Sequence, residues 1–409
     1  MNIFKRRVFF VASISLVFSI SSANAEKYDQ PANLRASQFI PASMMGGPNH
    51  QVDEKVANDG FLNMYTINSR FGTLKATSTL KLFKYINELN AVAAIEQAKA
   101  SGQFKEGVKE KAGDVIDGAK SLVYDPIGTV GGVASGVGKL FSRGKENLFG
   151  GSRSDAESSR MKDIMGFSKA KREYAHEFGV DVYSRNKILQ DKLDDISWSG
   201  YAGGISATVA LMAVPGGAVS VLGTTETLNE IYRDSAPADL RIMNRKKLMA
   251  LGVSEDITDL FVSNAVFTPR EQTAIVLSLE KMGKVKNPGT FVKLSVLTDD
   301  ADIAFFRQKQ AEMYANYDQK IEPIVSFVQL GQAVAAKTRS GKLVFNVPLD
   351  YLLWTRGIAA LGRAVSQNAS LMKGVKERHI WLTGDVSPMA RKELEKMGWN
   401  IHTRATNLL

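Results

Sequence analysis

The sequence contains no cysteine, and this absence excludes two ways of stabilising or anchoring an extracellular protein. A disulfide framework needs paired cysteines, and a lipoprotein needs an acylated cysteine at its processed N-terminus. The 409 residues are nevertheless enough for two or three hydrophobic cores. The chain must therefore be stabilised by those cores, or by partners.

Histidine is scarce as well. The four histidines are His50, His176, His379 and His402, and no two of them stand at the spacing of a metal-binding helix. The pair His176–Glu177 resembles the start of a zinc-binding helix, but Val180 occupies the position of the second histidine. The sequence therefore predicts no metal site.

Motifs that bind cofactors or carry catalysis are also missing. The glycine-rich stretch near residue 135 resembles a phosphate-binding loop, but Val133 replaces its first glycine and Leu140 replaces the serine or threonine that holds magnesium. There is no dinucleotide fingerprint and no G-x-S-x-G nucleophile elbow, and the Ser-x-x-Lys pattern recurs five times, too often to be informative. We predict no cofactor and no identifiable catalytic residue.

Clustered carboxylates allow one enzymatic interpretation and one structural one. Asp299, Asp300 and Asp302 could supply paired acids for glycoside hydrolysis if they were held at the proper separation. They also begin a predicted helix, where acids interact favourably with the positive end of the helix dipole. Helix capping is the simpler interpretation.

The N-terminus has the order of features that signal peptidase reads. Lys5, Arg6 and Arg7 are followed by an apolar run from Val8 to Ile20 and by the small-x-small sequence 23–25. The apolar run is shorter than the roughly 20 residues that span a bilayer, which favours cleavage over retention as an anchor. We expect cleavage after residue 25 and export to the periplasm or cell envelope.

The net charge of the chain indicates which classes of partner to expect. The formal net charge is +10, and removal of Lys5, Arg6 and Arg7 lowers it to +7. The longest basic clusters, 169–172 and 245–247, also suit solvated helix faces, so the excess looks thinly spread. Without a basic stripe carrying aromatics, nucleic acid is not expected as a partner. A membrane surface or an envelope component is the better prediction, and a small-molecule ligand stays unknown.

Helical periodicity dominates the chain. Apolar residues recur every three or four positions through most of residues 78–337, including the segment 322–337, and caps or breakers separate the repeats. We predict a mainly α fold with a multi-helix body and a small C-terminal three-stranded α/β unit. The predicted divisions are a signal peptide (1–25), an extended arm with short strands (26–76), an amphipathic and glycine-rich helical segment (77–150), a helical body (151–338) and a β-α-β-α-β unit (339–409).

The C-terminal unit is predicted from an alternation of strand and helix patterns. Residues 342–347, 379–383 and 399–403 are apolar or β-branched, and helical patterns lie between them. Ser387 followed by Pro388 is typical of a helix N-cap and first turn.

Glycines at every fourth position form the most distinctive pattern. On a helix, Gly128, Gly132 and Gly136 would share one face and permit close contact with a lipid surface or another helix. A flexible loop is the alternative, because glycine costs an exposed helix up to about 1 kcal/mol per residue relative to alanine. A second uncharged segment, 201–223, is interrupted at 215–217 and suits a buried hairpin better than a spanning helix.

Polar residues near the ends of the C-terminal strands are weak ligand candidates. Asp350 follows the first predicted strand, and Thr383, Asp385 and Ser387 follow the second. Open α/β sheets place their ligands at the carboxyl ends of parallel strands. The alternative is structural, with Ser387 capping a helix and Asp385 shaping the turn at Gly384.

These patterns support three hypotheses about function. The first is an exported, membrane-associated cell-envelope protein that works by association with membrane or protein, with Gly128, Gly132 and Gly136 as a glycine zipper. The second is a periplasmic hydrolase that uses Asp350 and Asp385. The third is a soluble periplasmic binding module. Ligand, oligomeric state and pathway do not follow from the sequence.

Overall fold

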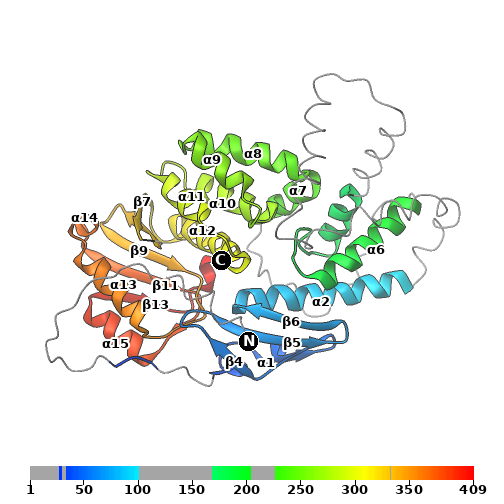
Figure 1. Ribbon diagram of the computed structural model, residues 1–409, viewed down its shortest axis with the longest axis horizontal. Helices are drawn as coiled ribbons and strands as arrows, with labels where there is room; N and C mark the ends of the chain where they lie inside the picture. Colours follow the sequence, from blue (N-terminus) through cyan, green and yellow to red (C-terminus); the bar gives the residue numbers. More distant parts are fainter. Residues whose placement is uncertain (1–26, 30–33, 101–167, 204–225, 332) are drawn as a thin grey trace. The chain divides into compact units, whose positions relative to one another are not determined.

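The computed structural model describes residues 27–29, 34–100, 168–203, 226–331 and 333–409 (Figure 1). These residues belong to two compact units. The larger contains the described residues up to 90, 226–228 and 235–409, and the smaller contains 91–100, 168–203 and 229–234. Two helices contribute to both units, namely α2 (Thr79–Ala100) and α7 (Glu226–Asp234).

The smaller unit is helical. In α6 (Lys187–Gly203), the buried side chains Leu189, Leu193 and Ile196 recur at helical spacing and form an apolar stripe. An ion pair of 2.7 Å between Lys192 Nζ and Glu96 Oε1 connects α6 to the second half of α2. Residues 168–177 form a further helix of this unit.

An antiparallel sheet of six strands forms the N-terminal part of the larger unit. Strand β5 is central, since β6 pairs with one edge while β4 and β3 pair in turn with the other. Tyr65 and Ile67 on β5 are buried beneath the sheet. The strands are β1 (Leu34–Arg35), β2 (Gly46–Gly47), β3 (His50–Val52), β4 (Lys55–Asn58), β5 (Asn63–Ser69) and β6 (Gly72–Thr77), with the short helices η2 (Ala36–Gln38) and α1 (Ala42–Met45) between them.

A mixed sheet of five strands forms the C-terminal part, in the order β13-β11-β9-β8-β7. Strands β9, β11 and β13 are parallel, whereas β8 and β7 are antiparallel additions beside β9. Its strands are β7 (Ile324–Leu330), β8 (Ala333–Thr338), β9 (Lys342–Val347), β11 (Glu377–Leu382) and β13 (Trp399–His402), and a separate parallel pair consists of β10 (Tyr351–Leu352) and β12 (Asp385–Val386).

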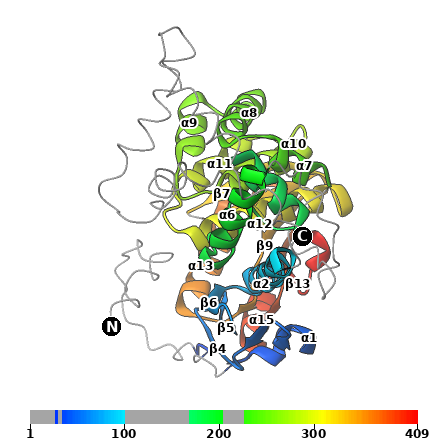
Figure 2. The same ribbon diagram turned by 90° about the vertical axis from the view of Figure 1, so that its right-hand side faces the viewer.

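Helices cover both faces of this sheet, as the alternation along β9 shows. Leu343 and Phe345 belong to a core with Ile358 and Leu394 from the helices of one layer, while Val344 belongs to a core with the other layer. The first layer contains α13 (Arg356–Gln367), α14 (Ala369–Met372) and α15 (Pro388–Lys396). The second contains α8 (Pro237–Ala250), α9 (Glu255–Ser263), α10 (Pro269–Lys281), α11 (Pro288–Val296) and α12 (Ala301–Lys320), which group together in both views (Figures 1 and 2), and the C-terminal η4 (Thr406–Leu408) packs beside α12.

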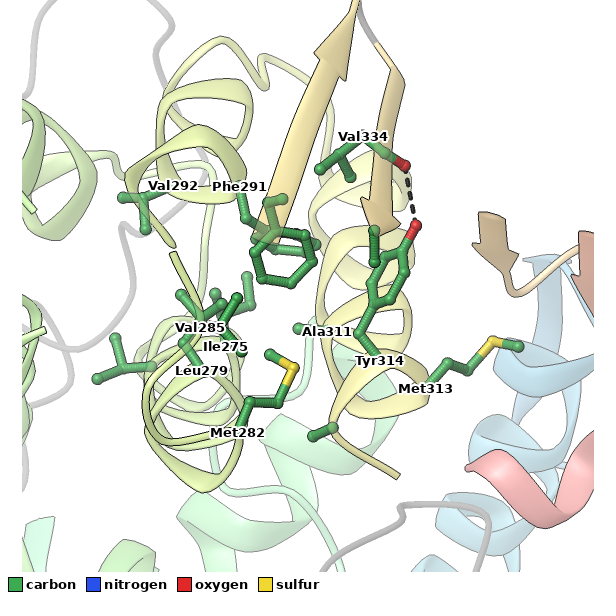
Figure 3. Packing of buried hydrophobic residues seen from close by; sticks show 14 of the residues in the cluster. Ile275, Leu279, Met282, Val285, Phe291, Val292, Ala311, Met313, Tyr314 and Val334 are labelled. Carbon is green, nitrogen blue, oxygen red and sulfur yellow. Dashed lines mark hydrogen bonds between the residues drawn. The ribbon is translucent and has the colours of Figure 1, made fainter. Parts of the chain in front are cut away.

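Aromatic packing joins the second helical layer to the sheet (Figure 3). The ring of Tyr314 on α12 lies edge-on to Phe327 on β7, with ring centroids 5.3 Å apart, and Phe291 on α11 packs against both. The Tyr314 hydroxyl donates a hydrogen bond of 2.9 Å to the carbonyl of Val334 on β8. The hydroxyl group is therefore buried together with a hydrogen-bond acceptor.

The mainly α prediction, with a small three-stranded unit, is wrong. The described residues form sheets of six and five strands and a separate two-stranded pair, and the three parallel strands near the C-terminus are part of the five-stranded mixed sheet. Two segments account for the error. Residues 324–338 form the antiparallel pair β7 and β8 instead of a helix, and the segment interpreted as an extended arm contributes β1 to β4.

Most helices of the second layer were correctly predicted because their ends carry local signals. Thr268 and Glu271 form a capping box at the start of α10, and Asp300 accepts hydrogen bonds from the amides of Asp302 and Ile303 at the start of α12. The capping interpretation of the acids at 299–302 is thereby confirmed for Asp300. The helix α11 was not predicted.

Candidate functional site

Asp350 lies at the carboxyl end of β9 and is buried. Its carboxylate accepts hydrogen bonds from the amides of Asn63 at 2.8 Å and Thr79 at 3.0 Å. Burial raises the pKa of this carboxyl to about 6, and the two amide donors oppose that shift. The Asp350 side chain therefore holds the start of β5 and the start of α2 against the C-terminal sheet.

Thr383 and Gly384 follow β11 and fit closely against the loop after β9. The Thr383 hydroxyl donates to the carbonyl of Leu349 at 2.9 Å. A Cβ atom at Gly384 would lie 1.9 Å from the Asp350 carbonyl oxygen. The two loops pack backbone against backbone at this point, and only glycine fits there.

Asp385 and Ser387 also have structural partners. The Asp385 carboxylate lies 3.5 Å from Arg391 and 3.3 Å from Arg404. The Ser387 hydroxyl accepts a hydrogen bond of 2.9 Å from Ala390 and caps α15, as its sequence context predicted. It also donates to Asp29, whose carboxylate accepts from the Trp354 amide at 2.6 Å.

The four predicted ligand candidates are therefore gathered at one end of the sheet, where they are engaged by protein groups. The backbone of residues 350–353 bonds there to the carbonyls of Gly60 and Phe61, which lie between β4 and β5 of the N-terminal sheet. Every one of the four side chains has a polar partner in the chain itself. Their arrangement supports a structural role at the carboxyl end of the parallel strands.

The β11–β13 edge of the sheet carries a histidine pair that sequence reasoning missed. His379 on β11 and His402 on β13 are joined by a hydrogen bond of 2.9 Å between Nδ1 of the first and Nε2 of the second. Nε2 of His379 lies 2.8 Å from the Glu377 carboxylate, and the His402 ring stacks on Trp381 with centroids 3.9 Å apart. We call these four residues the histidine cluster.

Strand register explains the cluster. Side chains alternate along β11, so Glu377, His379 and Trp381 share one face, and His402 is the register partner of Trp381. The two histidines are separated in sequence by α15, and helical spacing rules cannot bring them together. The available signal was the alternation Glu-x-His-x-Trp at 377–381, which begins two residues before the predicted second strand.

The hydrogen bonds of the cluster are compatible with two neutral imidazoles. In that form Nε2 of His379 donates to the Glu377 carboxylate, which can only accept, and Nδ1 of His379 is an acceptor. Nε2 of His402 then donates to that atom, and Nδ1 of His402 keeps its lone pair. The cluster is complete with both imidazoles neutral.

Burial favours the neutral form of His402. Burial, then the neighbouring His379, then the Lys342 ammonium lower the pKa of His402 below its usual value. Lys342 pairs with Glu322 at 3.3 Å. Burial of Glu322 opposes ionisation, but hydrogen bonds from Ser340, Thr338 and Lys342 outweigh it and lower its pKa to about 2.

This geometry predicts a pH-dependent contribution of His402 to stability. The folded state holds the pKa of His402 below the unfolded value, so the unfolded state binds more protons once the pH falls below about 6.5, and stability is lost there. Replacing His402 with phenylalanine keeps a ring against Trp381 and removes the titration. We expect urea midpoints between pH 8 and pH 5 to fall less for His402→Phe than for the wild type. Parallel curves for the two proteins would contradict the assignment.

Two loops beside the histidine cluster carry exposed cations without acidic partners. Lys337 lies near the end of β8 and Arg339 in the turn that follows it, and the loop before β11 holds Lys373 and Lys376. We call these four residues the cationic loop pair. Among the described residues, no acidic side chain forms an ion pair with any of the four.

Backbone contacts hold the two loops side by side. The amide of Lys376 donates to the carbonyl of Gly341 at 2.8 Å, and Lys337 Nζ donates to the carbonyl of Lys373 at 3.2 Å. Gly341 and Gly374 have φ angles of +94° and +76°, which suit glycine in such tight turns. The four cations therefore lie on two loops whose separation these hydrogen bonds fix.

Charge is concentrated in this part of the chain, contrary to the expectation that it is thinly spread. Residues 333–409 contain twelve lysines and arginines against five aspartates and glutamates, an excess of seven positive charges. Residues 26–332 contain 37 of each kind and are balanced. The whole positive excess that remains after the predicted cleavage thus lies in the C-terminal 77 residues.

Several predictions from the sequence concern residues outside the described ones. The signal peptide and the glycines Gly128, Gly132 and Gly136 are among them, as is most of the segment 201–223. Within the described ranges, no helix is both long enough and apolar enough to cross a bilayer. The same ranges contain no group of three or more histidine or acidic side chains that could hold a metal ion.

Comparison of the chain with protein-family models, with curated proteins and with solved structures gives no match. Functional inference therefore rests on the chemistry of the described surface.

Proposed function

We propose that this chain is an exported cell-envelope protein that works by association with an anionic partner, which residues 333–409 attract electrostatically. The concentration of the positive excess in those residues is the observation that carries the proposal. Fixed cations on one part of a protein raise its rate of encounter with anionic surfaces and its affinity for them. The signal-like N-terminus supports the cellular location.

Hydrolysis by Asp350 and Asp385 is less well supported. The Asp350 carboxylate is buried against two backbone amides, and the Asp385 carboxylate is flanked by two arginines. A general acid or base must reach a proton on its substrate. Both carboxylates already serve contacts within the fold, so association is the better proposal.

The glycine-rich face is a second, separate element of the proposal. If Gly128, Gly132 and Gly136 form a helix face that contacts lipid or another helix, part of the association is apolar and does not respond to salt. Gly132→Leu would then reduce envelope association, because a leucine side chain prevents the close approach that glycine permits.

Cell fractionation tests the proposal. We expect the chain to sediment with envelopes at low salt and to be released by a high-salt wash, because salt screens exposed charges. The mass of the recovered protein should correspond to a chain that begins at Glu26. Full recovery in the soluble fraction at low salt would contradict association, and resistance to both salt and carbonate washes would contradict an electrostatic mechanism.

A further inference from the structure

We propose that the cationic loop pair is the site through which the chain binds the headgroups of an anionic phospholipid bilayer. This inference rests on the proposed function, since it names the partner and the contact surface. The site comprises Lys337, Arg339, Lys373 and Lys376.

The first argument is the unbalanced charge of the site. Arg339, Lys373 and Lys376 are exposed, and Lys337 is partly so. The acids that border the two loops are committed elsewhere, because Glu377 bonds to His379 and Glu322 bonds to Lys342 and to the Ser340 amide. Four like charges on adjacent loops repel one another in the free protein, and an approaching anionic surface relieves that repulsion.

The second argument is that the site is built and does not depend on the folding of a flexible tail. Hydrogen bonds from Lys376 to Gly341 and from Lys337 to Lys373 fix the separation of the two loops. A Cβ atom at Gly341 would lie 3.2 Å from the Gly374 carbonyl oxygen, which shows how closely the loops approach. The two loops are therefore held together without a backbone ordering cost at the moment of binding.

The third argument concerns the kind of partner. The four cations are distributed over two loops on long, flexible side chains, which suits a surface whose phosphates are themselves dispersed. The apolar neighbours Met372 and Val375 pack toward the core beneath the loops. This arrangement favours contact at the level of the headgroups over insertion into the hydrocarbon.

Each lysine or arginine close to an anionic leaflet strengthens partitioning by about fivefold at physiological salt. Reversing two of the four charges removes two attractions and adds two repulsions. The expected loss of vesicle binding for Arg339→Glu/Lys376→Glu is therefore at least about 100-fold.

The test is vesicle flotation with the full chain purified after export. The wild type should float with vesicles containing phosphatidylglycerol and should not float with vesicles of phosphatidylcholine alone. The double variant Arg339→Glu/Lys376→Glu should lose that binding. The matched control Lys55→Glu/Lys75→Glu makes the same change in net charge on exposed residues of the N-terminal sheet, and its binding should stay within about threefold of the wild type.

Four results would overturn the inference. The first is binding of the double variant at the wild-type level, and the second is an equal loss in the control, which would make net charge responsible instead of the site. The third is displacement of the protein from vesicles by millimolar inorganic phosphate, which would indicate a discrete phosphate site. A wild-type chain that sediments with envelopes but does not bind vesicles containing phosphatidylglycerol would refute the lipid assignment and leave the proposed association intact.

Discussion

Replacement of Gly384 with alanine should prevent stable folding. The added Cβ would lie 1.9 Å from the carbonyl oxygen and 2.7 Å from the Cα of Asp350, and these are backbone atoms that cannot rotate away. The two segments cannot separate easily, because the Gly384 amide bonds to the Leu349 carbonyl at 2.8 Å and the Asp385 amide to the Asp350 carbonyl at 3.0 Å. We expect a loss of more than about 4 kcal/mol in the free energy of unfolding, measured by urea denaturation or seen as failure to recover folded protein.

Gly289→Ala is the matched control for this prediction. Gly289 lies in the first turn of α11, and the nearest atom to an added Cβ is Val253 Cγ1, at an ordinary contact distance of 3.8 Å. Alanine should leave stability unchanged or raise it by up to about 1 kcal/mol, because it restricts the unfolded chain. Equal urea midpoints for the Gly384→Ala and Gly289→Ala proteins would refute the backbone clash at Gly384.

Replacement of Asp350 with alanine should cost about 2–5 kcal/mol in the free energy of unfolding at acidic to neutral pH. The substitution leaves the amides of Asn63 and Thr79 without their acceptor, and an unsatisfied buried donor costs about 1–3 kcal/mol. Urea denaturation measures the loss. Asp385→Ala is the control, and because its arginine contacts are partly exposed, it should cost less than about 1 kcal/mol.

The cost of Asp350→Ala should also depend on pH. Burial raises the folded-state pKa of Asp350 to about 6, so the folded state binds more protons than the unfolded state between about pH 4 and pH 6. The contribution of this carboxyl to stability is therefore full below about pH 4 and is lost as the pH rises through 6. The gap between wild type and variant should be wider at pH 5 than at pH 7.5. A gap that narrows on acidification would show that the carboxyl is stabilised as an anion.

Local signals predicted much of the second helical layer, and the reasons are visible in single residues. Thr268 and Asp300 cap their helices through side-chain bonds to amides two or three residues away, which a linear sequence displays directly. Ser387 does the same at α15. Elements that are defined by neighbours in sequence could therefore be predicted.

Elements that depend on distant partners could not. Strand β7 includes Ile324, Phe327 and Val328, whose spacing also suits a helix, and β8 contains three alanines with high helix propensity. Pairing of β8 with β9 outweighs that propensity, since tertiary context decides strand formation. The N-terminal strands β1 to β4 are too short to show any period, and their pairing with one another and with β5 makes them a sheet.

The candidate site shows the same division. The sequence predicted Asp350 and Asp385 at the carboxyl ends of strands. In the structure, backbone amides at the starts of β5 and α2 donate to the Asp350 carboxylate, across 271 to 287 residues, and no local pattern reveals such a contact. The histidine cluster along β11 and β13, and the cationic loop pair beside the amino ends of β9 and β11, require knowledge of strand register and loop contacts. If the cationic loop pair makes the proposed lipid contact, the carboxyl end of this sheet is structural and its amino end carries the contact, which is the reverse of the usual expectation.

The urea midpoint of the Arg339→Glu/Lys376→Glu variant tests this division between the two ends of the sheet most directly. Both side chains are exposed and have no acidic partner among the described residues. We therefore expect the midpoint to correspond to a free energy of unfolding within about 0.5 kcal/mol of the wild type, in a protein that no longer binds anionic vesicles. A midpoint as low as that of Asp350→Ala would mean that the cationic loop pair holds the fold together, and it would contradict the account.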